Sequence, residues 1–540
     1  MTSSPEASLG THQVTNQPEP VGDRDLLGVD PLFETMLSRS GVGLAELRAY
    51  GQALGRQSMR DAARDANRNS PDLRLFDSAG RRLDEVRFHP AYHGFMQLSA
   101  AAGYHSVAWE GGANGNLRHA AMVYLASQVE PGHCCPLTMT YAAAPVLAQA
   151  DGLANWHSAI LSRDYDPSVR PVSEKRGATL GMAMTEKQGG SDVRSNRTEA
   201  VRDGGDWRLR GHKWFCSAPM SDGFLTLAQV DGAGLTCFLV PRWLEDGRNA
   251  IRLQRLKDKL GNRSNASAEI EYDGARANLV GTPGNGIRTI LGMVHHTRLD
   301  TAMAPAGLMR AALSEAVHWT RHRRAFGRQL IDQPLMQAVL ADCALDWAGS
   351  LALGLQVAQR FDGTSEDDRA FTRIAVALAK YLSNKLCPQV VCEAMEAIGG
   401  SGYVEDGVLP MLYREAPLNG IWEGSANVIC LDALRSMKGD GHSAEALRWT
   451  LEAARGQDTT YDSALRSYQS RWTTPPSEAD ARWFVEDTAA LLTAAVLLAQ
   501  QIPLVTEAYL QTRLGQQRGR FYGSLPAGQA DGILDACFCG

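Results

Sequence analysis

The sequence predicts a mainly α-helical protein with one inserted β domain. Apolar residues recur at spacings of three and four over most of the 540 residues, and the period changes to two only between about residues 180 and 285. We expect four units: an N-terminal arm and helical domain (1–179), a central β domain (180–285), a helical bundle domain (286–440) and a C-terminal helical domain (441–540).

The first unit begins with an arm. Residues 1–30 are rich in Pro, Ser, Asn and Gly, a composition that is poor material for a core element. Helical spacing follows in Pro31–Arg64, His89–Val107 and Leu117–Gln128. Pro136 and Pro145 bracket a further short apolar piece. Beyond the arm we therefore expect this unit to be all-helical.

The central unit carries strand and turn signals. Asp203-Gly204-Gly205 lies between Thr198–Val201 and Trp207–Arg210, which is typical of a β-hairpin. Further strands are predicted at Leu180–Met184, Phe224–Val230, Leu235–Val240 and Ala268–Tyr272.

Helical spacing dominates the rest of the chain. Three long segments, Ile287–His322, Pro334–Phe361 and Arg369–Ile398, are long enough for an antiparallel bundle. Four shorter helices are predicted after them: Ala444–Ala454, Tyr461–Tyr468, Glu478–Ala499 and Val505–Leu514. Breaks are expected at Pro475-Pro476 and Pro503.

Composition excludes several classes of function. A net charge of -6 argues against bulk attraction to nucleic acid, so any such contact must be a local basic patch. The ten cysteines form no Cys-x-x-Cys pair, and the adjacent His295 and His296 would point in different directions on a helix. We expect no metal site. Gly281–Gly286 lacks the dinucleotide-binding glycine pattern.

The chain carries no signal for export or for a membrane anchor. The N-terminus has neither a basic start nor an apolar run, and the longest apolar stretch, Ala489–Ala499, is too short to cross a bilayer. We expect a cytoplasmic protein without a membrane partner.

Two short runs indicate chemistry. Met184–Asp192 ends a strand-like segment in a Gly-Gly loop with many hydroxyl and amide donors, which suits an anionic cofactor. Ile421–Asn427 places Glu423 between Trp422 and Gly424, where burial would raise the carboxyl pKa towards that of a general base. Taken singly, such runs are more often a plain turn and a solvated helix start.

Five motifs in order resemble those of the acyl-CoA dehydrogenases. They are Thr185-Glu186 with Gly190-Ser191-Asp192, Lys213–Ser217, Arg323–Gly327, Gly399–Tyr403 and Trp422–Ser425. Within this family the chain is most similar to the alkylation-response (adaptive response) branch typified by AidB, on Asn16-Gln17-Pro18, Lys187-Gln188 and Leu256–Ser267. The resemblance implies a helical N-terminal domain, a central β-barrel domain and a helical bundle, followed by a helical extension over 441–540.

The resemblance also implies FAD as the cofactor and Glu423 as the catalytic base. The matching cofactor positions are Met182, Met184, Thr185, Gly190, Ser191, Phe215, Ser217, Arg323, Phe326, Gly400, Ile421, Trp422, Ser425 and Asn427. In the family, the positions of Arg323, Phe326 and Gly400 reach the FAD of a neighbouring subunit, which implies a dimer or a dimer of dimers (a homotetramer).

Five residues depart from the family pattern. Phe215 and Ser217 stand where Trp and Thr are common, although the serine keeps a hydroxyl donor. Glu396 stands where many members have Gln, and its charge would repel a pyrophosphate unless it is paired or points away. Lys187-Gln188 replaces small residues, which would narrow or recharge the acyl-CoA entrance.

In the AidB branch the C-terminal extension is associated with double-stranded DNA. The candidate contacts here are Arg435, Arg513, Arg518 and Arg520. From Arg435 to Gly540, however, ten Lys/Arg face twelve Asp/Glu, so only their arrangement could favour DNA. Exposed arginines on a helical oligomerisation domain explain the same residues equally well.

These observations favour an FAD-containing acyl-CoA dehydrogenase-like protein of the alkylation-response type. It would bind double-stranded DNA through its C-terminal domain, protect or repair it, and keep weak acyl-CoA dehydrogenase activity. The alternative is a metabolic acyl-CoA dehydrogenase, acting at the α,β bond of an acyl-CoA, with a C-terminal oligomerisation domain. A non-catalytic DNA-protecting protein that holds FAD structurally also fits the motifs.

Overall fold

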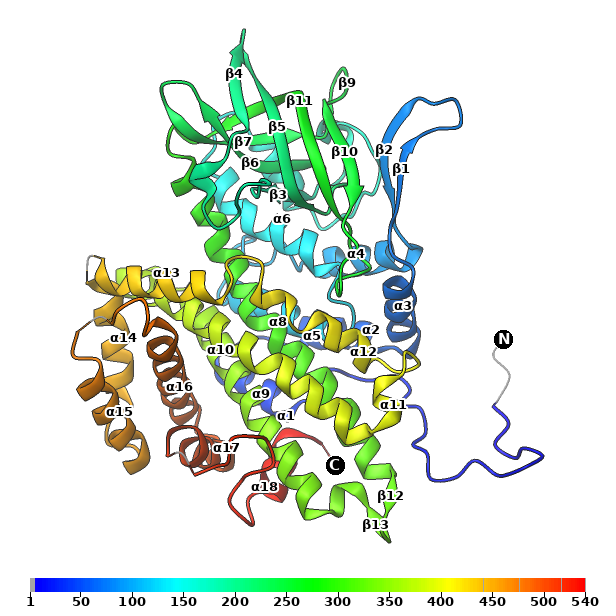
Figure 1. The fold of residues 1–540 in the computed structure, drawn as a ribbon, viewed down its shortest axis with the longest axis vertical. Helices are drawn as coiled ribbons and strands as arrows, with labels where there is room; N and C mark the ends of the chain where they lie inside the picture. The colour runs from blue at the N-terminus through cyan, green and yellow to red at the C-terminus, as the bar shows by residue number, and fades with distance from the viewer. Residues whose placement is uncertain (1–4, 440, 475, 516, 540) are drawn as a thin grey trace.

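A computed structural model describes residues 5–439, 441–474, 476–515 and 517–539 (Figure 1). The β domain forms one end of the molecule and the helical bundle forms the other, with the last helices beside the bundle. Pro475, half of the predicted Pro475-Pro476 break, lies outside the described residues.

The N-terminal part begins with an extended arm up to residue 30, whose first described residues are exposed and project away from the body of the molecule (Figure 1). Its helices are α1 (Pro31–Arg39), α2 (Leu44–Gly55), α3 (Gln57–Arg68), α4 (Pro90–Ala102), α5 (Gly115–Ser127), α6 (Cys134–Leu147) and α7 (Ala154–Ile160). The predicted segment Pro31–Arg64 is thus three helices, because Gly41 adopts the left-handed conformation between the first two. Pro136 and Pro145 both lie inside α6 instead of bracketing a separate piece.

The prediction that this part is all-helical is wrong. Strands β1 (Asp72–Phe76) and β2 (Arg82–Arg87) form an antiparallel hairpin. Val86 is buried in the core of the β domain, and Leu73 and Leu75 pack against the same core. The hairpin therefore draws its stability from a domain that begins about a hundred residues later, which a reading of local periodicity misses.

The β domain is a small closed barrel, as the resemblance implied. Its strands are β3 (Leu180–Ala183), β4 (Glu199–Asp203), β5 (Asp206–Ser217), β6 (Gly223–Val230), β7 (Gly234–Pro241), β8 (Trp243–Leu244), β9 (Gly247–Arg248), β10 (Ile251–Leu256) and β11 (Ser267–Val280). The pairings β11–β5–β4–β6–β7 return to β11, so this ring has no free edge. The predicted hairpin at Gly204-Gly205 is confirmed between β4 and β5, whereas β8, β9 and β10 were not predicted.

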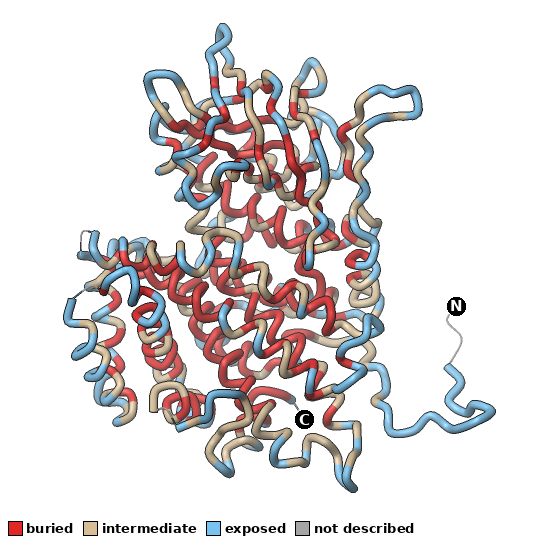
Figure 2. Tube along the Cα trace, viewed as in Figure 1, coloured by how far each residue is buried: buried red, intermediate tan, exposed pale blue. Residues whose placement is uncertain are grey.

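Three long helices form the bundle: α8 (Gly286–His322), α9 (Pro334–Phe361) and α10 (Glu366–Ile398). They share one apolar core with the N-terminal helices and with the C-terminal part, which Figure 2 shows as a continuous buried interior. The shorter helices are α11 (Gly400–Tyr403), α12 (Leu409–Glu415), α13 (Ala426–Lys438), α14 (His442–Ala453), α15 (Thr459–Arg471), α16 (Ala481–Gln500), α17 (Pro503–Tyr509), a π-helical turn (Leu510–Leu514) and α18 (Ala530–Cys537).

Among the described residues, α9 and α16 are long and apolar enough to cross a membrane. Most of each apolar window is buried inside the fold, 89% in α9 and 61% in α16, which is the environment of core helices. The length of α16 also exceeds that of the apolar run Ala489–Ala499 on which the sequence argument relied.

Candidate active site

Glu423 occupies a strained turn between η4 (Leu418–Gly420) and α13. Its φ is +57°, in the left-handed region that non-glycine residues avoid at a cost of roughly 1–2 kcal/mol, and Gly424 follows at +100°. The indole Nε1 of Trp422 donates to Oδ1 of Asn419 at 2.7 Å, which braces the turn from within.

Residues from α8 and α10 surround the Glu423 carboxylate. Thr297 Oγ1 donates to Oε2 of Glu423 at 2.8 Å, and Arg298 Nε donates to the Glu423 carbonyl at 3.4 Å. Burial raises the pKa of Glu423, while the Thr297 hydroxyl and the nearby charges of Lys380 and Arg298 limit the rise. A carboxyl with a raised pKa that is still held as an acceptor is suited to general-base work.

The loop after β3 is anchored by a buried ion pair. Lys213 Nζ lies 2.8 Å from Oε1 of Glu186, and both side chains are fully buried. The same carboxylate accepts hydrogen bonds from the backbone N–H groups of Arg197 and Thr198. Burial alone would raise its pKa, yet Lys213 and these donors hold the pKa of Glu186 at about 2. The loop therefore has a fixed base and an exposed tip.

The tip of this loop presents hydrogen-bond donors. Gly190 and Ser191 are exposed and Thr185 is half-buried. Within the described part of the chain, the hydroxyls of Thr185 and Ser191 have no hydrogen-bond partner. Thr185 is fixed through its backbone, because its carbonyl accepts from Trp214 N–H at 2.7 Å. These donors suit an anionic ligand on the open side of the loop.

The two sequence runs converge. Met182, Met184 and Trp422 all pack against one apolar cluster that includes Cys135 of α6. Burial raises the pKa of the Cys135 thiol to about 12. The charge of Glu423 raises this pKa further, whereas the charge of Lys259 and a hydrogen bond with Ser217 lower it, so Cys135 lies near all three residues. The cofactor-loop strand, Ser217 and the Glu423 turn therefore line the same region.

Two more of the predicted cofactor residues, Phe215 and Ile421, have exposed apolar side chains. Nζ of Lys257 lies 4.8 Å from the ring centroid of Phe215, and Ile421 precedes Trp422 in the turn. Ser425 is exposed as the residue before α13, and its hydroxyl makes no capping bond there. Asn427 Oδ1 accepts from Arg482 of α16 at 2.8 Å, so this side chain links the turn to the C-terminal part.

Arg323, Phe326 and Gly400 lie far from the Glu423 turn of the same chain. Arg323 follows Thr297 by 26 residues along α8, roughly 39 Å at a rise of about 1.5 Å per residue. Gly400 follows Lys380 by 20 residues along and just past α10, roughly 30 Å by the same rise. Phe326 is 96% exposed at the tip of the short hairpin β12 (Arg324–Ala325) and β13 (Arg328–Gln329). Arg323 donates to the Asn16 carbonyl of the arm at 2.7 Å.

The four predicted DNA contacts do not form one stripe. The prediction for Arg513 is wrong, because its guanidinium is only 7% exposed and pairs with Asp342 at 2.6 Å and Asp346 at 2.9 Å. Arg518 is partly buried, 3.9 Å from Asp342, whereas Arg520 is exposed. Arg435 on α13 is 67% exposed.

Arg435 belongs to a different basic cluster. Asp432 pairs with Arg298 at 2.6 Å, with Arg373 at 2.8 Å and with Arg435 at 3.6 Å. Three guanidinium groups on one carboxylate leave an excess of positive charge beside the Glu423 turn.

Thr297, Arg298, Lys380, Lys259 and the Glu186–Lys213 pair were not predicted as site residues. Lys380 carried a signal as a lone cation in the apolar helical run 374–382, and Glu186, Lys213 and Lys259 lie within the runs that carry the family resemblance. The others come from elements whose contacts form only in the folded chain.

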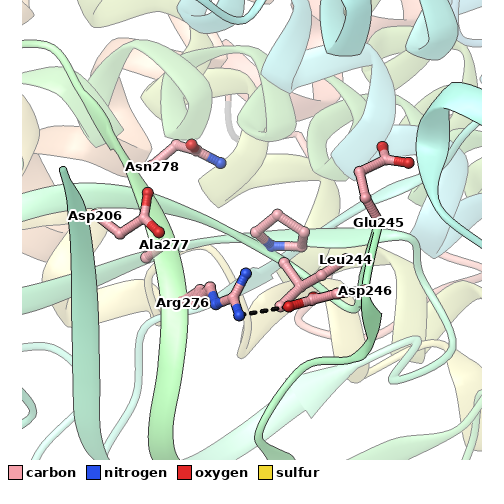
Figure 3. A pocket seen from close by; sticks show the side chains of 8 residues that line it. Asp206, Leu244, Glu245, Asp246, Arg276, Ala277 and Asn278 are labelled. Atoms are coloured by element: carbon pink, nitrogen blue, oxygen red, sulfur yellow. Dashed lines mark hydrogen bonds and ion pairs between the residues drawn. The ribbon is translucent and has the colours of Figure 1, made fainter. Parts of the chain in front are cut away.

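A separate pocket lies on the β domain (Figure 3). It has a volume of about 350 Å³, and Arg276 bridges to Asp246 at 2.6 Å across it. Asp206, Glu245 and Asp246 give its lining an acidic character. None of the predicted site residues lines it, so it is distinct from the Glu423 region.

Comparisons with known proteins point to one family. Family models match three consecutive segments: the adaptive response protein AidB N-terminal domain over residues 16–167, the acyl-CoA dehydrogenase middle domain over 181–275 and the acyl-CoA dehydrogenase C-terminal domain over 284–438. These segments end before the C-terminal helices.

Full-length relatives extend the similarity to nearly the whole chain. The acyl-CoA dehydrogenase-type protein AidB of Escherichia coli K12 is 43% identical over 518 residues, which cover 94% of this chain and 95% of that one. Acyl-CoA dehydrogenase family member 11 of Caenorhabditis elegans is 32% identical over 468 residues, 83% of this chain and 74% of the relative.

Two solved structures have the same architecture. The C. elegans ACDH-11 complex with C11-CoA matches with a TM-score of 0.84 and 27% identity, covering 96% of each chain. The Bd2924 apo-form matches with a TM-score of 0.81 and 27% identity, covering 90% of this chain and 99% of that one. Members of this family are FAD-binding flavoproteins. The chain belongs to the acyl-CoA dehydrogenase family, and within it to the AidB-like branch.

Proposed function

We propose that the protein oxidises an acyl-CoA thioester between Cα and Cβ with Glu423 as the base, slowly, and that its principal partner is double-stranded DNA, which it protects or repairs. The observation that carries the catalytic part is the half-buried Glu423 carboxylate, held by Thr297 at the point where the cofactor-loop strand and Ser217 converge.

The donor set fits FAD. Thr185 and Ser191 offer hydroxyls without partners in the described chain. Met182, Met184 and Trp422 supply an apolar wall. Hydride acceptance is the chemistry that FAD supplies when bound, since no protein side chain accepts hydride.

The chain's own residues account for the proton. Glu423 takes the α-proton of the thioester, and Thr297 holds the carboxylate in position while it does so. The backbone N–H of Glu423 is suited to donate to the thioester oxygen and stabilise the enolate-like charge. Bound C11-CoA in the ACDH-11 structure supports an acyl-CoA thioester as the substrate class.

The expectation of slow turnover rests on the long side chains beside the cofactor loop. Lys187 is exposed at the loop tip, and Lys257 lies 3.3 Å from the Trp214 ring centroid and 4.8 Å from that of Phe215. Long cationic side chains at these positions narrow access to the Phe215 ring.

The assembly we propose is a dimer or a dimer of dimers. Arg323, Phe326 and Gly400 lie too far from Glu423 to serve the same chain's site, and the Phe326 ring is almost wholly exposed. A second subunit that receives this hairpin tip would both bury the ring and complete the site.

The DNA proposal is supported by the excess positive charge at Asp432. Arg373 and Arg435 are partly exposed there, 42% and 67%, and Arg298 of the same cluster donates to the Glu423 carbonyl. Residues 435–540 carry more acidic than basic side chains, and Arg513 is buried. Both observations favour DNA contacts from α13 rather than from the last helices. A cytoplasmic location is part of the same proposal.

The catalytic proposal is tested with the purified yellow holoprotein. Acyl-CoA thioesters of several chain lengths are incubated with an artificial electron acceptor. We expect measurable turnover in the wild type and a loss of at least about 100-fold in Glu423→Gln, with the flavin absorption unchanged. Equal turnover of the two proteins would refute Glu423 as the base, and absence of turnover in both would leave the non-catalytic alternative.

The DNA proposal is tested with duplex DNA at increasing salt. We expect binding at low salt that weakens as salt rises, because phosphate contacts release counterions. Arg435→Gln should weaken binding and lower the salt dependence. Arg448→Gln on α14 is a matched control, since its side chain is 66% exposed, and it should bind as the wild type does. Absence of binding at low salt would favour the metabolic enzyme with an oligomerisation domain.

A further inference from the structure

Lys380 is a buried cation that the proposed chemistry leaves unused. It lies in the middle of α10 with 1% of its surface exposed, among apolar neighbours on the same helix. A buried ammonium is costly unless it is paired or fully hydrogen-bonded, so its retention requires a structural account.

Among the residues that the structure describes, the Lys380 ammonium donates hydrogen bonds only to the backbone of the Glu423 turn. Nζ donates to the carbonyl oxygens of Asn419 at 2.7 Å, Trp422 at 2.9 Å and Gly424 at 3.1 Å. Asn419 and Trp422 precede Glu423 in the chain, and Gly424 follows it. One side chain thus ties together residues 419–424, the segment in which Glu423 and Gly424 adopt the left-handed conformation.

Three acceptors require three N–H groups. An ammonium has three donors, whereas a neutral amine has only two, so the complete arrangement exists only while Lys380 is charged. Loss of its proton would leave one buried carbonyl without a donor, at a site where the backbone is already strained.

The charged groups around Lys380 come from three elements. Glu423 on the turn favours its protonated form, Arg298 on α8 disfavours it, and Asp300 on α8 and Asp432 on α13 face the same cluster. Burial is the largest influence and lowers the pKa of Lys380 to about 7. The ammonium therefore titrates close to neutral pH.

We infer that Lys380 is a positioning residue whose ammonium holds the 419–424 turn in the strained conformation that aims the Glu423 carboxylate at Thr297 and the substrate. This inference rests on the proposed role of Glu423. Deprotonation of Lys380 then loosens the turn and gives the reaction an alkaline limb that does not arise from the base itself.

Three variants of the holoprotein test this assignment through turnover. Lys380→Met should lower kcat by about 10- to 100-fold, since a misplacement of about 1 Å costs rate of this order. Lys380→Arg keeps its charge at all accessible pH values, so its remaining activity should not fall as pH rises from about 6 to about 9. Lys385→Met, an exposed lysine on the same helix, is the control and should keep the wild-type rate and alkaline limb.

Hydrogen exchange gives a readout that needs no substrate. Peptides covering 418–424, corrected for intrinsic rates, should exchange faster in Lys380→Met than in the wild type, and protection in the wild type should fall as pH rises through about 7. This measurement distinguishes failure of the inference from failure of the proposed function. Unchanged exchange of this segment in Lys380→Met, or a wild-type alkaline limb in Lys380→Arg, would overturn the role of Lys380.

Discussion

The hydroxyl of Thr297 donates to Oε2 of Glu423 across 2.8 Å and so joins α8 to the turn that precedes α13. The two residues are 126 positions apart in the chain. Their contact means that the bundle helps to hold the side chain of the proposed base.

Thr297→Val should move the acid limb of turnover to higher pH. Removing the hydroxyl removes a hydrogen bond that lowers the pKa of Glu423, so a higher pH is needed to ionise the base. We expect a displacement of about one pH unit, from the usual strength of a hydrogen bond to a charged group. The measurement is kcat/KM against pH. Thr320→Val is the control, because the Thr320 hydroxyl donates to carbonyls of α8 itself, and an identical displacement there would contradict the assignment.

Glu186→Gln should destabilise the cofactor loop strongly. It leaves the Lys213 ammonium buried without its counter-charge, which typically costs about 3–5 kcal/mol. Denaturant unfolding and flavin release both report the loss. The double variant Glu186→Gln with Lys213→Met should recover much of the stability, since no unpaired charge then remains. Glu452→Gln, which breaks an exposed pair with Arg455, should have little effect.

Glu415→Gln should change the dependence of stability on pH. Burial raises the pKa of Glu415 to about 7 from 4.5, even though Asn262 donates to its carboxylate at 3.0 Å. The folded state therefore favours the protonated acid. Stability from this group is complete below about pH 4.5 and is lost as pH rises through about 7, by at most about 3 kcal/mol. Between about pH 5 and about pH 8, the unfolding free energy of the wild type should therefore fall by more than that of Glu415→Gln. A constant difference between them across that range would refute it.

Phe326→Ser should dissociate the assembly. The ring is 96% exposed in one chain, and the proposed partner subunit would bury it. Size-exclusion chromatography with light scattering should show a smaller species with less bound flavin. Phe521→Ser provides the matched control, since Phe521 is 73% exposed on the C-terminal loop. An unchanged mass for Phe326→Ser would place the interface elsewhere.

Much of the fold could be predicted because its signals are local. Period-three and period-four spacing located α8, α9 and α10 to within a few residues, and Gly204-Gly205 located the β4–β5 turn. The hairpin β1–β2 was missed because its apolar side chains face a core that later strands supply. Pro136 was misread because a proline in the first turn of a helix interrupts no hydrogen bond.

The candidate site was likewise predictable where its signals are local and unpredictable where it depends on tertiary contacts. By itself the sequence determined the family and the bundle–barrel order, and it named Glu423 as the candidate base, since ordered motifs survive without any knowledge of contacts. Only the tertiary structure decided that Thr297 and Lys380 hold that residue, that Arg513 is sequestered by Asp342 and Asp346, and that Phe326 projects away from the site of its own chain. Burial, hydrogen-bond partners and pKa depend on which distant segments meet, and that information appears only when the chain has folded.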